Sequence, residues 1–264
     1  MERAGPDHKQ VVQHEFSQQA PQYAANPLIS DPARIARLVR AVSPAPTARV
    51  LEVATGPGHV ALGFAAVCRE VVGIDLTAAP LALAERLRQE RGLANARFAL
   101  GDAEATGFAD GAFDVVVCRY AFHHFADPPA VLREMTRVCR AGGTVALEDL
   151  VVSEQPARAA YQNRFEHLRD PSHTRAYPLS ELLALLTANG LELEAVYSDA
   201  LTQEVERWLA NAHTLPERAA EARALIERDA REDLSGARPY RADGRLWFVQ
   251  RTAALVGRKL AAPA

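Results

Sequence analysis

Short apolar runs alternate with segments of helical periodicity through the middle of the chain. The apolar runs lie at residues 49–53, 70–75, 96–100, 113–118 and 144–150. The segments between them place apolar residues three and four positions apart, as on one face of a helix. Alternating strands and helices of these lengths are typical of parallel strands joined by crossover helices. The pattern therefore predicts an α/β fold with a doubly wound parallel sheet.

The pattern changes towards both ends of the chain. Asp31 and Pro32 form a typical helix start, with Asp31 as the cap and Pro32 in the first turn. Beyond residue 151, polar and charged stretches surround two further apolar segments, which predict the last strands of the sheet. Three parts are expected, namely a helical lid at 1–46, a core at 47–151, and the rest of the sheet at 152–264 with substrate-cap insertions at about 152–178 and 201–243.

Composition and charge narrow the classes of partner. The chain has 264 residues, of which 48% are hydrophobic, a net charge of −3 and a pI of about 6.3. The sequence has no basic stretch suited to nucleic acid or anionic lipid, and no apolar run of membrane-spanning length. Its N-terminus is polar, unlike a secretory signal. We expect a soluble cytoplasmic protein with neither nucleic-acid nor membrane partners, and a homodimer remains open.

The few cysteines and lysines limit the chemistry further. Cys68, Cys118 and Cys139 lie far apart in apolar segments, which is typical of buried thiols in a reducing compartment. No cysteine pair has metal-ligand spacing, so no metal site is expected. Lys9 and Lys259 are the only lysines, and neither lies in a glycine loop or a Tyr-x-x-x-Lys pattern. The lysine of a phosphate-binding loop, a Schiff base or a short-chain dehydrogenase is therefore missing.

The most informative segment is a glycine loop that follows the first strand. Residues 50–62 read Val-Leu-Glu-Val-Ala-Thr-Gly-Pro-Gly-His-Val-Ala-Leu, and Asp75 ends the second strand. Strand, glycine loop, helix start, strand and acidic residue together build a nucleoside pocket at the carboxyl edge of a parallel sheet. Gly56 and Gly58 let the backbone approach a ligand, and the N–H groups of the next helix favour a carboxylate. The alternative is an ordinary tight turn.

Glu52 distinguishes this loop from a dinucleotide-binding loop. A carboxylate before the glycines would repel a pyrophosphate but would attract an ammonium group. S-adenosylmethionine combines a nucleoside with an α-ammonium group and has no phosphate, so we expect it as the cofactor, with S-adenosylhomocysteine as product. Glu52 would then bind the ammonium group and Asp75 the ribose hydroxyls. Asp102 follows the third strand at the same edge, where it could accept the adenine amino group or, alternatively, cap a helix.

The segment 118–125 leaves the fourth strand beside the expected methyl donor. It contains His123 and His124, and histidine titrates near neutrality, so either is a candidate general base; the alternative is that one caps or packs under the cap. Tyr120 is a candidate for substrate binding. The neighbouring Asp127-Pro128-Pro129 is similar to the Asp-Pro-Pro-Tyr motif of amino-methylating nucleic-acid enzymes. It lies too far from the strand and lacks the tyrosine, so helix capping explains it better.

The insertion at 152–178 holds further candidates. Its residues 170–177 read Asp-Pro-Ser-His-Thr-Arg-Ala-Tyr. His173 is a third candidate base, and Arg175 could hold an anionic group of the substrate if the segment closes over the pocket. A solvated loop is the alternative for both residues.

Three motifs together resemble class I S-adenosylmethionine-dependent methyltransferases. They are Val-Ala-Thr-Gly-x-Gly-His-Val-Ala at 53–61, Cys-Arg-x-Ala-x-His-His-Phe at 118–125 and Ser-His-x-Arg-Ala at 172–176. The likeness is greatest to the ubiquinone- and menaquinone-biosynthesis-like group, and within it to a branch of stand-alone bacterial proteins. It covers about Phe16 to Arg258 and implies a Rossmann-like seven-stranded sheet in the order 3-2-1-4-5-7-6, with strand seven antiparallel.

The resemblance also implies cofactor roles by position. The residues that it assigns to the cofactor are Tyr23, Glu52, Ala54, Thr55, Gly56, Gly58, Asp75, Leu76, Asp102, Ala103 and Arg119. Leu76 would pack on the adenine, Arg119 would contribute its backbone, and Tyr23 would reach the pocket from the N-terminal lid. Ala54 departs from the wider family, which usually has glycine there, and its methyl group would narrow the loop.

These observations favour an enzyme that transfers a methyl group to a small-molecule acceptor at an O, N, C or S atom. One alternative is a nicotinamide-dependent oxidoreductase, because residues 56–61 also fit Gly-x-Gly-x-x-Ala. Glu52 and the absent catalytic lysine argue against it. A non-catalytic protein that binds S-adenosylmethionine is another alternative, and a different reaction in the same pocket is a third.

Overall fold

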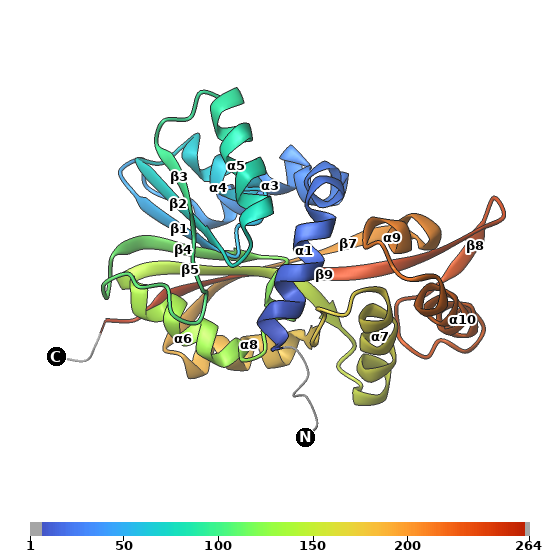
Figure 1. Ribbon diagram of the computed structural model, residues 1–264. Helices are drawn as coiled ribbons and strands as arrows, with labels where there is room; N and C mark the ends of the chain where they lie inside the picture. The colour runs from blue at the N-terminus through green and yellow to red at the C-terminus, as the bar shows by residue number, and fades with distance from the viewer. Residues whose placement is uncertain (1–6, 262–264) are drawn as a thin grey trace, which may run out of the picture.

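One mixed sheet forms the centre of the molecule, for which a computed structural model describes residues 7–261, except the side chains of Tyr23 and Pro27. The strand order is β3-β2-β1-β4-β5-β9-β7 (Figure 1). The strands are β1 (Arg49–Val53), β2 (Glu70–Asp75), β3 (Ala96–Leu100), β4 (Phe113–Arg119), β5 (Cys139–Val152), β7 (Leu191–Glu204) and β9 (Arg245–Lys259). The first five are parallel, and β9 is antiparallel to both β5 and β7. With β7 as the sixth strand and β9 as the seventh, the predicted Rossmann-like order is confirmed.

Helices cover both faces of this sheet. One face carries α3 (Pro32–Val42), α4 (His59–Ala65) and α5 (Ala78–Glu90), and the other carries α6 (Pro128–Val138) and α8 (Leu179–Ala188), as Figure 1 shows. The N-terminal helix α1 (His8–Ala25) packs along α5, and α2 (Pro27–Ser30) follows it. A short turn of 3-10 helix, η1 (Phe122–His124), continues from β4.

The inner strands β1 and β2 formed because their side chains are buried on both faces. Val50, Leu51 and Val53 of β1 have no exposed surface. A parallel strand between two helical layers reads as a continuous apolar run, which explains why the bounds of β1 and β2 match the predicted ones. Full burial of one such side chain contributes about 1.5–3 kcal/mol, so these strands are firmly specified by the sequence.

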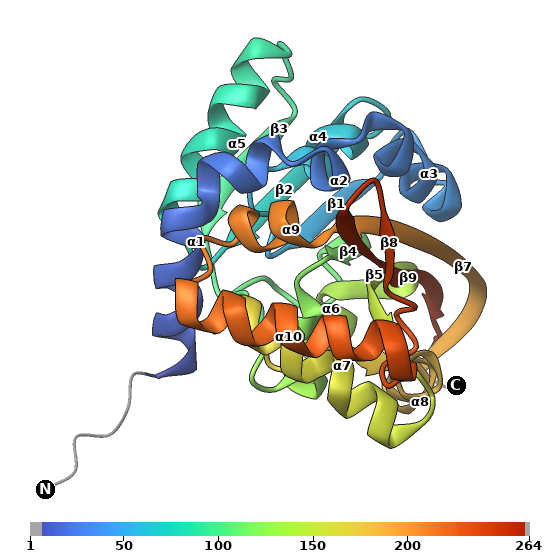
Figure 2. The ribbon, with the colours of Figure 1, turned by 90° about the vertical axis from the view of Figure 1, so that its right-hand side faces the viewer.

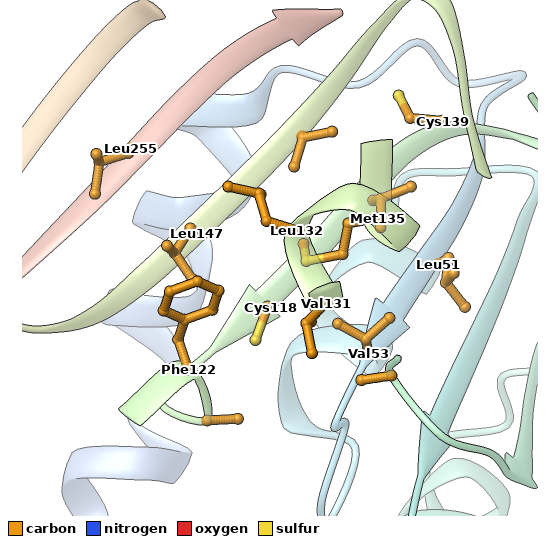
Figure 3. Packing of buried hydrophobic residues seen from close by; sticks show 14 of the residues in the cluster. Leu51, Val53, Cys118, Phe122, Val131, Leu132, Met135, Cys139, Leu147 and Leu255 are labelled. Atoms are coloured by element: carbon orange, nitrogen blue, oxygen red, sulfur yellow. The ribbon is translucent and has the colours of Figure 1, made fainter. Parts of the chain in front are cut away.

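α6 packs against the face of the sheet opposite to α3, α4 and α5. Its residues Val131, Leu132 and Met135 are fully buried and pack near Cys118 and Leu147 of the adjacent strands (Figure 3). The helix starts as predicted, since the Asp127 carboxylate accepts the backbone N–H of Ala130 at 3.0 Å. The capping interpretation of Asp127 is therefore confirmed. All three cysteines are free and buried, also as predicted.

The structure differs from the predicted pattern in its C-terminal half. The segment expected as a polar insertion contains a helix, α7 (Pro156–Arg169), whose buried face includes Gln162 and Glu166. Because these buried positions are polar, the segment lacks the apolar stripe by which a helix is usually recognised in a sequence. β7 is also longer than expected, because Leu201 is the one buried side chain in its outer half, which forms through pairing with β9 rather than through an apolar run. Two short strands, β6 (Tyr177–Pro178) and β8 (Tyr240–Ala242), were not predicted.

The outer halves of β7 and β9 carry a small second core. We define the cap as α7, α9 (Val205–Asn211) and α10 (Pro216–Glu232) together with these outer strand halves; Figure 2 shows it beside the sheet. The rings of Phe165, Trp208 and Phe248 meet edge to face at its centre, with centroids 5.0–6.0 Å apart. One aromatic cluster thus fixes α7 and α9 onto β9.

Candidate functional site

A cleft lies where β1, β2, β3 and β4 end, beneath α1. It encloses about 940 Å³ of empty space, including its open mouth. The predicted cofactor residues that line it are Glu52, Ala54, Thr55, Gly56, Asp75, Leu76, Asp102, Ala103 and Arg119. Gly58 does not line the cleft, and the side chain of Tyr23 lies outside the described part of the chain. Parallel strands therefore bring these separate segments to one edge, as their positions at strand ends require.

Glu52 lies buried at the floor of the cleft. Its Oε2 accepts the Thr55 hydroxyl at 2.5 Å and the backbone N–H of Ala61 at 2.8 Å. No described residue donates a hydrogen bond to Oε1, which leaves one carboxylate oxygen for a ligand. Burial raises the pKa of Glu52 to about 8, despite these hydrogen bonds and the nearby Arg119 charge. A cationic ligand group would therefore convert a largely neutral carboxyl group into a carboxylate.

Asp75 joins the tip of β2 to the glycine loop. Its Oδ2 accepts the backbone N–H of Gly56 at 2.8 Å, and its Oδ1 accepts that of Thr77 at 2.9 Å. Burial raises the pKa of Asp75, although the hydrogen bonds from the backbone oppose this shift. Each oxygen keeps a second lone pair, so the carboxylate can still accept two hydroxyl groups.

The two glycines of the loop have different tasks. Gly56 (φ +52°) lines the cleft, where the backbone can approach a ligand. Gly58 (φ +77°) is required by packing, because a Cβ there would lie 2.7 Å from the Phe98 ring and 2.8 Å from Ala84 Cβ. Ala54, which stands where the wider family has glycine, also adopts a left-handed conformation, with φ +51°. The loop thus holds a non-glycine residue in a strained region at the cleft wall.

We expect Gly58→Ala to destabilise the protein, whereas Gly107→Ala serves as a matched control. Both glycines have positive φ, but a Cβ at Gly107 would meet nothing within 4 Å. Both variants carry the left-handed backbone cost of about 1–2 kcal/mol. Only Gly58→Ala adds an overlap in the core, which typically costs a further 1–3 kcal/mol. Thermal melting should therefore show a clearly larger loss for Gly58→Ala; equal losses would contradict the packing role.

The N-terminal helix closes the side of the cleft that Asp102 and Glu104 line. Lys9 Nζ donates to Asp102 Oδ2 at 2.6 Å and to Glu104 Oε2 at 2.7 Å. Gln13 of the same helix donates to the backbone carbonyl of Leu76 at 3.0 Å. Asp102 thus lies where the sequence placed it, but its carboxylate is shared with Lys9. The role of Lys9 as a clamp between α1 and the sheet edge was not predicted, because it depends on a contact across 93 positions.

Arg119, which lines the cleft, belongs to a buried ion pair. The Arg119 guanidinium donates to Glu148 Oε2 at 3.0 Å and to the Ile29 carbonyl at 2.9 Å. The same group lies 4.3 Å from the centroid of the Tyr120 ring. Tyr120 is a second non-glycine residue with a left-handed backbone, at φ +52°. Arg119 therefore orients the Tyr120 ring at the inner end of the cleft.

A second cavity opens beyond Tyr120, and we call it the acceptor chamber. It holds about 630 Å³ of empty space and shares Phe16, Ile29, Tyr120 and His124 with the first cleft. The remaining lining residues come from α1, α2, β5, the cap and its flanking segments, namely Gln19, Asn26, Leu28, His123, Leu150, Arg169, Asp170, Leu201, Gln203, Trp208, Asn211 and Gln250. The shared residues make the two cavities neighbours, as a donor and an acceptor site would need to be.

Asp149 orients His123 in the acceptor chamber. His123 Nδ1 is hydrogen-bonded to Asp149 Oδ1, and Asp149 Oδ2 accepts the backbone N–H of Phe122 at 2.6 Å. No described residue contacts Nε2 of His123 through a hydrogen bond. Burial alone would lower the pKa of His123, but the charge and hydrogen bond of Asp149 outweigh it and raise the pKa. A carboxylate that fixes one imidazole nitrogen leaves the other to act as a base.

His124 is less suited to that role. Its Nδ1 is 3.0 Å from the Ser172 hydroxyl, which also donates to Asp170 at 2.6 Å. Burial and the neighbouring His123 lower the pKa of His124 to about 4, so this ring is neutral and weakly basic. It lies between the two cavities and contacts Phe16 edge to face at 5.0 Å. His124 therefore separates the two cavities and is poorly suited to accept a proton.

The structure corrects the expectations for His173 and Arg175. His173 lies behind His123, with 5.4 Å between ring centroids, and its Nε2 bonds to Asn163 at 2.8 Å. It lines neither cavity. Arg175 is exposed, pairs with Glu181 at 2.6 Å and covers the Tyr177 ring. It also lines neither cavity.

Asp149 and Arg169 are site residues that the sequence reasoning missed. Asp149 could have been found, because it is a polar residue near the end of the buried strand β5, three positions before Val152. Arg169 ends α7, a helix that was not predicted, so its position had no local signal. Within residues 7–261, no cluster of His, Cys, Asp and Glu is arranged to hold a metal ion. None of the described helices has the length and apolar character needed to cross a membrane.

Comparison with known proteins identifies the family. The family described as methyltransferase domain matches residues 51–147. The uncharacterized methyltransferase YcgJ of Bacillus subtilis is 33% identical over 203 residues, which are 77% of this chain and 80% of that protein. The demethylmenaquinone methyltransferase of Thermus thermophilus is 42% identical over 147 residues, covering 53% of this chain and 64% of that protein.

Solved structures agree with this result. The crystal structure of YcgJ matches with a TM-score of 0.82 at 29% identity, covering 87% of this chain and 99% of that chain. The Bacillus halodurans protein BH2331 matches with a TM-score of 0.82 at 32% identity, covering 87% of this chain and all of that chain. Since sequence and fold agree over most of both chains, and the cleft lies where the matched segment ends its strands, this chain belongs to the methyltransferase-domain family.

Proposed function

We propose that the protein uses S-adenosylmethionine to methylate a small molecule bound in the acceptor chamber. The observation that carries the proposal is the pairing of two adjoining cavities with different chemistry. The first exposes a carboxyl group, Glu52, and a ribose-type acceptor, Asp75, at the edge of the sheet. The second holds an oriented histidine, His123, beside the shared wall. A donor and an acceptor could meet at Tyr120 and His124, which both cavities share.

The electrostatics of the first cleft support S-adenosylmethionine over a nicotinamide dinucleotide. Glu52, Asp75 and Asp102 all line it, and Lys9 is already paired with Asp102 and Glu104. A pyrophosphate would meet these carboxyl groups without a free lysine nearby. An α-ammonium group would instead find Glu52 Oε1, and its carboxylate could lie at the N–H groups where α4 begins.

The reaction needs alignment first and a base second. The nucleophile attacks the methyl carbon in line with the sulfonium, the S–CH₃ bond breaks, and S-adenosylhomocysteine leaves. Holding both groups in line can contribute about 7–11 kcal/mol to lowering the barrier. If the acceptor atom carries a hydrogen, its proton goes to Nε2 of His123, and Asp149 stabilises the resulting imidazolium. This oriented base favours an enzyme over a protein that only binds S-adenosylmethionine.

Calorimetric titration with S-adenosylhomocysteine, with NADH as a comparison ligand, tests the proposal. We expect micromolar binding of S-adenosylhomocysteine and none of NADH. Asp75→Ala should weaken binding by about 10- to 100-fold, because hydrogen bonds to a charged group each contribute about 1.5–3 kcal/mol. Asp110→Ala removes an exposed carboxylate outside the cleft and should leave the affinity unchanged. A preference for NADH would overturn the proposal and favour a redox enzyme.

A further inference from the structure

Arg169 presents an uncompensated guanidinium group to the acceptor chamber. Its Nε donates to the Trp208 backbone carbonyl at 3.0 Å, and its charge lies 5.2 Å from the centroid of the Trp208 ring. These contacts fix the plane of the guanidinium and occupy Nε alone. No carboxylate of the described residues lies within 4.0 Å of it. Its terminal nitrogens therefore remain available to a ligand.

The two nearest acidic groups do not neutralise this charge through direct contact. Glu166 is buried and accepts Gln250 Nε2 at 2.7 Å, and burial raises the pKa of this carboxyl group. Asp170 accepts the backbone N–H of Ser172 at 2.9 Å and its hydroxyl at 2.6 Å. Burial would raise the pKa of Asp170, but its interaction with His124, the charge of Arg169 and the hydrogen bonds from Ser172 lower it. Asp170 is thus hydrogen-bonded to Ser172 and Glu166 to Gln250, and neither forms an ion pair with Arg169.

The rest of the chamber is neutral and amphipathic. Phe16, Tyr120 and Trp208 supply aromatic faces, and Gln203 and Gln250 form an amide pair at 2.7 Å. Such walls suit a flat ring with polar groups at its edge. A planar guanidinium matches the two oxygens of a carboxylate better than a point charge does. Among the described residues, Arg169 is the only arginine or lysine that lines the chamber.

From this arrangement we infer that the acceptor carries a carboxylate, bound by Arg169, and presents a ring hydroxyl towards His123. The inference rests on the proposed function and specifies its substrate class. In this reading the methyl carbon leaves sulfur and bonds to the hydroxyl oxygen, while the hydroxyl proton moves to His123. Arg169 acts as the specificity-determining residue and Trp208 as the surface that holds its plane.

Three nearly isosteric probes test the charge preference directly. They are the hydroxybenzoates, hydroxybenzamides and hydroxybenzamidines, each with the hydroxyl at position 3 or 4, titrated into the protein saturated with S-adenosylhomocysteine. We expect the carboxylate to bind at least about tenfold more tightly than the amide, and the amidine to bind most weakly. Because this comparison uses the unmodified protein, it does not depend on the folding of any variant.

Substitution then assigns the preference to Arg169. Arg169→Gln should reduce carboxylate binding to the level of the amide, and Arg169→Lys should give an intermediate affinity. Arg175→Gln is the matched control, since this arginine ends in a surface pair with Glu181 and should leave the order unchanged. Equal affinities for the three probes, tightest binding of the amidine, or no binding of any probe to the protein saturated with S-adenosylhomocysteine would overturn the inference alone. Failure to bind S-adenosylhomocysteine would instead overturn the proposed function.

Discussion

Turnover of the His123→Ala variant is expected to fall by about 10²–10⁴-fold with an acceptor that must lose a proton, because a positioned general base typically contributes that much. Asp149→Asn should cause a comparable loss. The substitution removes the charge that holds the His123 tautomer and stabilises the imidazolium. Single-turnover rates with saturating S-adenosylmethionine would measure the chemical step separately from product release.

The pH dependence distinguishes this role from a structural one. His123 must be neutral to accept a proton, so the rate should rise with pH through its pKa, which Asp149 raises. In Asp149→Asn the pKa should fall, and the rising limb should move to lower pH while the maximum rate drops. NMR titration of the imidazole nitrogens would follow the same pKa without any acceptor. His173→Gln, which changes a buried histidine outside both cavities, is the control.

The base assignment fails under one clear outcome. If neither His123→Ala nor His124→Ala lowers the single-turnover rate by at least about tenfold, neither histidine acts as the base. Loss in His124→Ala alone would transfer the role to the ring that lies between the two cavities.

Affinity for S-adenosylhomocysteine should increase about tenfold per pH unit between pH 6 and 7 and level off near pH 8. The free protein holds Glu52 largely protonated over this range, since burial raises its pKa to about 8. Binding of the ligand ammonium requires the carboxylate, so each bound ligand releases one proton at pH 6. The direction follows from the raised pKa, because a raised carboxyl pKa makes the charged form rarer at lower pH.

Calorimetry in buffers of different ionisation enthalpy would count the released proton. Glu52→Gln keeps an oxygen that can accept the Thr55 and Ala61 hydrogen bonds, so the loop should stay intact. This variant should bind weakly, with a flat pH profile and no proton release. A wild-type profile that is equally flat would show that Glu52 does not pair with the ammonium group.

The sequence predicted which residues meet at the first cleft, for a physical reason. Residues that line it, such as Glu52, Asp75 and Asp102, lie within two positions of the end of a short strand. Burial on both faces produces an apolar run, and the first polar residue after it marks the sheet edge. The position of these residues at strand ends in the sequence therefore predicted their position at the carboxyl edge of the sheet.

The residues around the acceptor chamber lacked such a local signal in the sequence. Arg169 and Arg175 are six positions apart in one polar stretch, and only the unpredicted helix α7 places the first inward and the second outward. The outer half of β7 has one buried side chain, Leu201, so pairing with β9 rather than apolar patterning defines it. Contacts between distant segments, including that of Lys9 with Asp102, likewise cannot be predicted from the sequence pattern around either residue.

The continuity of β7 and β9 limits how this architecture can be altered. Both strands begin or end in the central sheet and run without interruption into the cap, where Gln203 and Gln250 line the acceptor chamber. The cap is therefore no separate module that could be exchanged by cutting two loops. A chimera with a new acceptor preference would have to transplant both strands with their register. In this architecture, substrate preference would therefore be inherited together with the two strands that also build the central sheet.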